Sequence, residues 1–227
     1  MCLANQDTPD PREDTPAEEF ARGEERYRVG AFAEAAAIFE KLCRNNPGFP
    51  APIRLLGLCR LRLGDPEAGL ELLQQARTLA PFDPYAQLHY GIGLHAVGRH
   101  REAAELFAAC RTDLPLDPAP HLNLASALLA LGRPGEAVDA ARRARRRAPK
   151  LPQAHYVLGQ ALLAAGRLDE ALTAFTDCLR LAPAFADAWV NLGIVRYRKS
   201  DIEGAYGQPV ASAPACQRPR ARPLAAL

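Results

Sequence analysis

Apolar residues recur along the chain in pairs of helix-length stretches. In residues 152–185 the first stretch carries Leu158 and Leu162, and the second carries Leu172 and Phe175, each pair at helical spacing. A glycine stands between the two stretches and a proline follows the second. Gly accepts the positive φ at the end of a helix, and Pro cannot continue a helix. The pattern therefore predicts two helices in this block.

The same pattern returns every 34 residues without insertion or deletion. Its markers are a glycine between the helices, a small residue on each helix that lets the two approach closely, and a closing proline. Because one helix pair cannot bury its apolar face alone, this period predicts an all-α chain, an α-solenoid whose stacked pairs form a continuous core. The blocks are residues 16–49, 50–83, 84–117, 118–151 and 152–185, followed by a partial block, 186–206.

These markers resemble the tetratricopeptide repeat family, whose 34-residue pattern is W-x2-L-G-x2-Y, then A-x3-F, then P. Trp189, Leu192 and Gly193 match its opening, although Arg196 stands where the pattern has Tyr. The resemblance covers residues 16–206 and implies a right-handed superhelix of helix pairs. It does not specify a partner.

In this family the first helix of each repeat lines a concave face, mainly through repeat positions 2, 5, 9 and 12, counted from the first residue of a block. Carried over, these positions give a largely apolar groove that suits an amphipathic helix or an extended apolar peptide. Exposed apolar patches usually mark binding sites; the alternative is that some of these residues pack on neighbouring helices. The predicted peptide-binding residues are Tyr85, Leu88, Ile92, His95, Leu122, Ser126, Leu129, Gln153, Tyr156, Gln160, Leu163, Val190, Ile194 and Tyr197.

The two ends of the chain depart from the repeat. Residues 1–15 are acidic and contain Pro, which predicts a disordered tail, and Thr15 with Glu18 predicts a capping box at the first helix. The first helix is rich in charged residues, as a terminal capping repeat requires. Residues 207–227 are rich in Pro and Arg and have no helical period, so we expect a second disordered tail.

The sixth block has no complete second helix in the sequence, because Pro209 stands where the pattern has Phe. Its first helix should therefore leave apolar residues exposed, which predicts self-association or a missing continuation of the repeat. One hypothesis is that the chain is a truncated or frame-shifted remnant of a longer repeat protein. A continuation of the 34-residue pattern in another reading frame past codon 203 would support it.

Candidate chemistry is sparse. The sequence has no H-E-x-x-H, phosphate-binding loop, G-x-S-x-G or kinase motif, so it predicts no catalytic residue and no cofactor. His121 and His155 share repeat position 4, but no further ligands stand at matching spacing for a metal. We expect both to pack at helix interfaces with a polar edge. Cys110 and Cys178 also share one position, which predicts small packing residues.

Charge gives little support for a nucleic-acid or membrane partner, because the formal net charge is +2. The basic run at 142–150 fits a solvated helix end that complements the helix dipole; the alternative is a salt-sensitive basic binding site. Neither a secretory signal nor a spanning stretch is present, which predicts a cytoplasmic protein. The Arg-rich, Lys-poor composition suggests a GC-rich bacterial genome.

The sequence therefore predicts a non-enzymatic scaffold or adaptor that binds a protein or peptide segment along its concave face. The alternative is the repeat region of a larger protein, such as a glycosyl- or sulfotransferase with N-terminal repeats.

Overall fold

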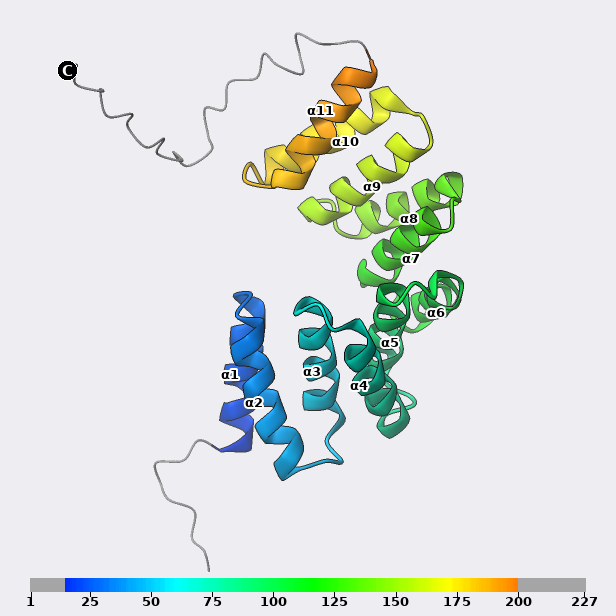
Figure 1. The fold of residues 1–227 in the computed structure, drawn as a ribbon. Coiled ribbons are helices and arrows are strands. Elements are labelled where there is room, and N and C mark those ends of the chain that lie inside the picture. Colours follow the sequence, from blue (N-terminus) through cyan, green and yellow to red (C-terminus); the bar gives the residue numbers. More distant parts are fainter. Residues whose placement is uncertain (1–14, 200–227) are drawn as a thin grey trace, which may run out of the picture. The chain divides into compact units, whose positions relative to one another are not determined.

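The computed structural model describes residues 15–199, in which every regular element is an α-helix and no strand occurs. Blocks one to five each supply two helices, and the described part of the sixth block, residues 186–199, supplies one (Figure 1). The all-helical repeat architecture is thereby confirmed. The expected tails and residues 200–206 lie outside the described part, except Thr15. The helices are α1 (Pro16–Arg28), α2 (Phe32–Asn45), α3 (Pro50–Arg62), α4 (Pro66–Leu79), α5 (Pro84–Ala96), α6 (His100–Asp113), α7 (Ala119–Ala130), α8 (Pro134–Arg147), α9 (Pro152–Ala164), α10 (Leu168–Leu181) and α11 (Ala186–Arg198).

The helices fall into two compact units, divided after Gly132 within the fourth block. The first unit contains α1 to α7 and the second contains α8 to α11. In each unit, helices adjacent in the sequence pack on one another, and helices of the same kind in successive repeats also touch, as α3 and α5 do. Each unit is therefore a stack of helices, as the 34-residue period predicts, with the complete pairs α1–α2, α3–α4 and α5–α6 in the first unit and α9–α10 in the second.

The turn inside each repeat depends on glycine. Gly30, Gly64, Gly98, Gly132 and Gly166 all have φ between 69° and 86°. A residue with a Cβ adopts this left-handed backbone at a cost, whereas Gly does so freely. The regular spacing of these glycines therefore sets where the first helix ends in each of the first five repeats.

A second class of glycine lets the two helices of a repeat approach each other. These glycines stand at repeat position 8 of the first helix and face a large apolar residue at position 24 of the second. A Cβ added to Gly159 would lie 2.6 Å from Cε1 of Phe175, whose ring is fully buried. The same close approach joins Gly23 to Phe39, Gly57 to Leu73 and Gly91 to Phe107.

Gly69 occupies a position where the other complete blocks have Ala. From helix propensity alone, Gly costs roughly 1 kcal/mol in the middle of a helix. A Cβ at this site would lie 2.5 Å from Cδ2 of Leu61 and 3.0 Å from the carbonyl oxygen of Gly57. The second repeat therefore brings α3 and α4 closer than Ala at this site would permit.

In the third, fifth and sixth repeats, the residue at repeat position 4 donates a hydrogen bond to the turn that precedes the first helix. Nε2 of Gln87 donates to the carbonyl oxygen of Pro81 over 3.0 Å, and the indole N–H of Trp189 donates to that of Pro183 over 2.8 Å. In the fifth repeat, His155 is buried and its Nε2 lies 2.8 Å from the Pro149 carbonyl oxygen. Since a carbonyl only accepts, this nitrogen carries the proton.

We expect His155→Leu to lower the free energy of unfolding by about 1 kcal/mol, the usual net value of a hydrogen bond, because it removes the donor to the Pro149 carbonyl oxygen. His155→Gln restores an N–H donor of the kind that Gln87 supplies, and should recover most of the loss. Urea denaturation of the two variants checks this. Equal destabilisation by Leu and Gln would show that ring packing, and not the hydrogen bond, matters at this position.

The start of α1 confirms one prediction and corrects another. The Thr15 side chain and the Glu18 carboxylate form the predicted capping box. The expectation of a charged outer face is wrong at Glu19, whose side chain is buried and accepts from Lys41 Nζ over 2.5 Å. A buried carboxylate requires such a partner, so Glu19 joins α1 to α2.

Candidate peptide-binding surface

In the first unit, the predicted inner-face residues differ in accessibility. On α5, Tyr85 is exposed, whereas Ile92 and His95 are half-buried. Leu88 is only 2% exposed, so its assignment to the binding surface is wrong: it belongs to the core between helices. The α7 residues at these positions, Leu122, Ser126 and Leu129, are all half-buried.

A polar cluster that sequence reasoning missed lies beside Tyr85. Arg54 of α3 donates to Nδ1 of His89 over 2.9 Å, and the Tyr85 hydroxyl donates to Oδ2 of Asp117 over 3.1 Å. Arg54 is a donor only, so Nδ1 of His89 carries no proton. Burial, followed by the Arg54 charge, lowers the pKa of His89 to about 4. The hydrogen bond to Asp117 raises the pKa of Tyr85.

The other predicted histidine of α5 also has a partner that the sequence did not indicate. His95 faces His100, the first residue of α6, with their Nδ1 atoms 3.0 Å apart. Burial, and then the neighbouring imidazole, lower the pKa of His95. In this hydrogen bond one Nδ1 donates and the other accepts, because two protonated Nδ1 atoms would repel each other.

In the second unit, Tyr156 organises the inner face of α9. Its hydroxyl accepts from Nε2 of Gln160 over 2.9 Å and from Nδ2 of Asn191, on α11, over 3.4 Å. Its ring lies 4.9 Å from that of Phe185 and 6.0 Å from that of Phe175, measured between centroids. The half-buried Tyr156 is therefore held in one orientation by its hydroxyl and by its ring.

The remaining predicted residues of the second unit give this face its apolar character. On α9, Gln153 is exposed and Leu163 is half-buried. On α11, Val190, Ile194 and Tyr197 are 62%, 40% and 69% exposed. Their spacing of i, i+4 and i+7 places them in one stripe. The structure thus brings Tyr156 and the α11 stripe into one unit, where Asn191 links the two helices.

Two of these hydrogen-bonded pairs have the same spacing in the sequence: Arg54 with His89, and Tyr156 with Asn191. Each joins repeat position 5 to position 6 of the following repeat, 35 residues further along the chain. The repeat register could have located both pairs. The residue types at positions 5 and 6 differ from block to block, however, so the sequence did not indicate that these residues form hydrogen bonds.

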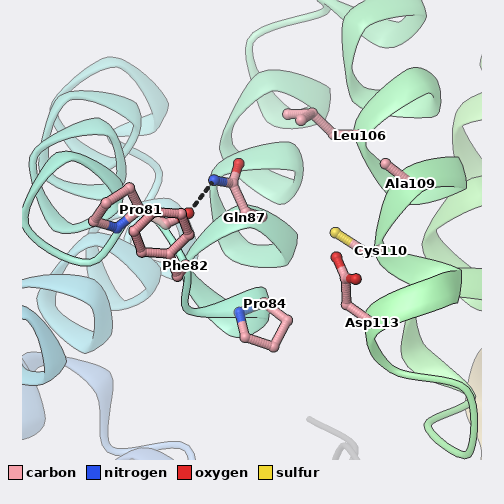
Figure 2. Close-up of a pocket in the computed structure, with 8 residues that line it drawn as sticks. All are labelled: Pro81, Phe82, Pro84, Gln87, Leu106, Ala109, Cys110 and Asp113. Atoms are coloured by element: carbon pink, nitrogen blue, oxygen red, sulfur yellow. Dashed lines mark hydrogen bonds between the residues drawn. The ribbon is translucent and has the colours of Figure 1, made fainter.

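A separate recess of about 340 Å³ lies in the first unit, between the turn that precedes α5 and one face of α6 (Figure 2). Gln87 crosses it to reach the Pro81 carbonyl. The α6 wall consists of Leu106, Ala109, Cys110 and Asp113. The recess is open and has no cluster of polar groups, so it does not define a ligand.

The basic run of α8 is partly neutralised. Arg142 donates to Oε2 of Glu170 on α10 over 2.8 Å, and Arg145 is half-buried. Arg147 contacts the Arg143 carbonyl at the end of the helix, where cations complement the helix dipole. These contacts favour the interpretation of the run as a helix end.

The buried thiols are packing residues. Cys59, Cys110 and Cys178 are at most 2% exposed, and all are free. Burial raises the pKa of each thiol, that of Cys59 to about 11. Because the thiolate is the reactive form, these side chains are chemically protected in the folded chain.

We therefore expect iodoacetamide at pH 8 to leave Cys59, Cys110 and Cys178 unmodified in the native chain and to modify all three after denaturation. Peptide mass spectrometry resolves each site. The half-buried Cys43 provides the internal comparison and should react faster than the other three. Rapid native labelling of Cys110 or Cys178 would contradict the packing of α6 or α10.

Within residues 15–199, no helix is long and apolar enough to cross a membrane. The same part of the chain has no group of three or more His, Cys, Asp or Glu side chains placed to hold a metal ion.

Comparisons with known proteins identify the repeat. Family models described as tetratricopeptide repeat match residues 27–89, 91–152, 122–183 and 156–221. No curated protein sequence matches the chain. Among solved structures, TTC0263, a thermophilic TPR protein of Thermus thermophilus, is similar with a TM-score of 0.73 at 21% identity. That match covers 81% of this chain and 100% of that chain.

Two pilus-related structures are also similar. PilW, described as a widely conserved type IV pilus biogenesis factor, matches with a TM-score of 0.75 at 19% identity over 86% of this chain and 90% of its own. PilF of Pseudomonas aeruginosa matches with a TM-score of 0.68 at 15% identity, over 85% of this chain and 87% of its own. Identities this low show a shared fold and nothing finer. With family models matching most of its length and helix pairs in the 34-residue register, the chain belongs to the tetratricopeptide repeat family, whose members generally mediate protein–protein interactions.

Proposed function

We propose that the chain is a non-enzymatic scaffold that binds a peptide segment of another protein along the inner face of its first helices. The observation that carries the proposal is the exposed stripe of Val190, Ile194 and Tyr197 on α11, at three of the four repeat positions that line this face. Soluble proteins seldom leave three large apolar side chains in one stripe uncovered.

The chemistry of this face indicates the kind of peptide. The α11 stripe provides apolar contacts, and Tyr156 beside it offers a hydroxyl fixed by Gln160 and Asn191. A rigid aromatic residue with a polar tip is a common anchor in peptide recognition. The second unit therefore suits a short amphipathic segment that places apolar side chains on α11 and a polar group at Tyr156.

The first unit adds a positive charge to its own inner face. Arg54 is half-buried and oriented by its hydrogen bond to His89, which stays neutral at physiological pH because its pKa is lowered. A partly desolvated Arg binds carboxylates more strongly than an exposed one. A partner segment that reaches α3 and α5 should carry an acidic residue or a C-terminal carboxylate there.

A peptide-display selection tests the proposal. Twelve-residue peptides selected on the wild-type chain should bind by fluorescence polarisation and lose at least about tenfold in affinity with Val190→Asp/Ile194→Asp, because truncating an apolar anchor commonly costs more than 1 kcal/mol. Both residues are exposed, so the variant should keep its helical circular dichroism.

The matched control changes equally apolar residues away from the inner face. Phe82 and Leu116 lie in the turns between repeats and are 96% and 87% exposed. Phe82→Asp/Leu116→Asp should leave binding of the same peptides unchanged. The proposal would be overturned if the selected peptides bound the Val190→Asp/Ile194→Asp chain as they bind the wild type and failed to bind the Phe82→Asp/Leu116→Asp chain.

A further inference from the structure

Two histidine side chains face each other at the turn between α5 and α6. His95 is the second-last residue of α5, and His100 is the first residue of α6. Their Nδ1 atoms are 3.0 Å apart, their ring centroids are 4.7 Å apart and their ring planes are inclined by 55°. Neutral imidazole is the commonest metal ligand among protein side chains. A pair of ring nitrogens this close together is therefore a candidate chelating site.

Backbone hydrogen bonds of the turn hold the two histidines in place. The amide of Arg99 donates to the Leu94 carbonyl oxygen over 2.8 Å, and the amide of His100 donates to the Gly98 carbonyl oxygen over 2.8 Å. Gly98 closes the turn with a φ of 84°. Both imidazoles are also half-buried. The pair is thus positioned by the fold and does not depend on a chance meeting of long, mobile side chains.

The distance between the two nitrogens fits a single metal ion. Zinc, nickel and copper are suited to imidazole ligands, and they bind the nitrogen at about 2.0 Å. Two nitrogens at this distance, in neighbouring positions of a square-planar or tetrahedral ion, lie about 2.8 to 3.3 Å from each other. The observed 3.0 Å is within this range. An ion can therefore take the place of the hydrogen bond between the rings when the imidazoles rotate toward it.

Protonation and charge around the pair are compatible with a cation. Burial, followed by the His100 imidazole, lowers the pKa of His95, which favours the neutral ring that binds metals. The charge of Arg99, which lies between the two histidines in the sequence, is paired with Glu102 through two hydrogen bonds. When an ion binds, the proton on one Nδ1 leaves and Nε2 of the same ring takes up a proton, so both rings stay neutral.

The remaining histidines are arranged differently. Nδ1 of His89 accepts from Arg54, and Nε2 of His155 donates to the Pro149 carbonyl oxygen. His121 is only 3% exposed. The chain has five histidines, all within residues 15–199. The other three therefore serve as internal controls for His95 and His100.

We propose that His95 and His100 form a binding site for a divalent transition-metal ion of the zinc, nickel or copper class, with both Nδ1 atoms as ligands. Water completes the coordination, because residues 15–199 place no third His, Cys, Asp or Glu side chain with the pair. The bound ion joins the last turn of α5 to the first turn of α6.

Titration of the full chain with Zn(II) tests the proposal. The chain is made without a histidine tag and carries Cys2→Ser and Cys216→Ser, because thiolates are strong zinc ligands. Calorimetry should give one ion per chain. His95→Gln or His100→Gln should each weaken binding at least about tenfold, since joining two ligands in one site commonly raises affinity by about 10²–10⁴. His89→Gln is the matched control, and it should bind zinc as the parent chain does.

Nuclear magnetic resonance of the parent chain identifies the ligating atoms without any histidine substitution. Two-bond ¹H–¹⁵N spectra of the imidazoles should show zinc-dependent shifts at Nδ1 of His95 and His100, and no shift at His89 or His155. The proposal would be overturned by the absence of binding up to millimolar zinc, by zinc binding that leaves both imidazoles unchanged, or by equal affinity in a folded His100→Gln chain. No peptide is present, so this result is independent of the peptide-binding proposal.

Discussion

Replacing Gly159 by Ala should lower the free energy of unfolding by about 1–3 kcal/mol, the usual cost of overpacking a closely packed core. The added methyl group would lie 2.6 Å from Cε1 of Phe175, a ring with no exposed surface that cannot easily move away. Ala is the better helix former by roughly 1 kcal/mol. The clash is expected to outweigh this gain because the neighbour is a rigid ring and not the end of a flexible chain.

The same contact predicts a compensating pair. Phe175→Ala alone should cost about 3–5 kcal/mol, because it leaves a cavity in the core. Adding Gly159→Ala to Phe175→Ala should cost little more, since the new methyl enters vacated space. The fourth block has this combination naturally, with Ala125 at position 8 and Ala141 at position 24.

Urea denaturation of the wild type, both single variants and the double variant forms the cycle that checks this. A favourable coupling of more than about 1 kcal/mol is expected for residues in direct contact. Gly135→Ala serves as the control, because its methyl group meets nothing and should not destabilise the chain. Additive effects of the two core substitutions would contradict the close approach of α9 and α10.

Lowering the pH from 6.5 to 4 should destabilise the chain through His89. Burial and the Arg54 charge lower the pKa of this imidazole to about 4, against an ordinary value of 6.5. Between these two values the unfolded chain binds a proton that the folded chain does not, so stability is complete above pH 6.5 and falls as the pH decreases. The difference amounts to about 3 kcal/mol at pH 4.

The His89→Gln variant isolates this contribution, because Gln keeps an acceptor for Arg54 but does not titrate. Carboxylates titrate in both proteins over the same range, so the quantity to measure is the difference between their stability–pH curves. The free energy of unfolding of the wild type should fall more steeply than that of the variant between pH 6.5 and 4. Parallel curves would show that His89 is accessible to protons in the folded chain.

The repeat register predicted the elements of this fold well, because each marker has a local physical cause. Gly166 and its counterparts have the positive φ expected at the end of a helix, and Thr15 forms its capping box. The close approach expected from small residues is seen at Gly159. Such features depend on the backbone and on near neighbours in the sequence.

The binding surface was harder to predict, because burial depends on what the neighbouring helices bring. Leu88 shares its repeat position with Val190, yet Leu88 is in the core and Val190 is exposed. The hydrogen bond of Arg54 to His89 joins residues 35 apart whose types recur in no other block. The family pattern states which repeat positions line the concave face but not which residues occupy them, so it could not predict this hydrogen bond.

Site-specific photo-crosslinking in cells tests most directly whether a natural partner lies on the inner face. Benzoyl-phenylalanine would replace Tyr85 or Val190 on the inner face, and Phe82 or Leu116 in the turns; all four residues are exposed. We predict a protein adduct that forms from Val190 or Tyr85 and is absent, or much weaker, from both turn positions. Adducts that form only from Phe82 or Leu116 would contradict binding through the inner face.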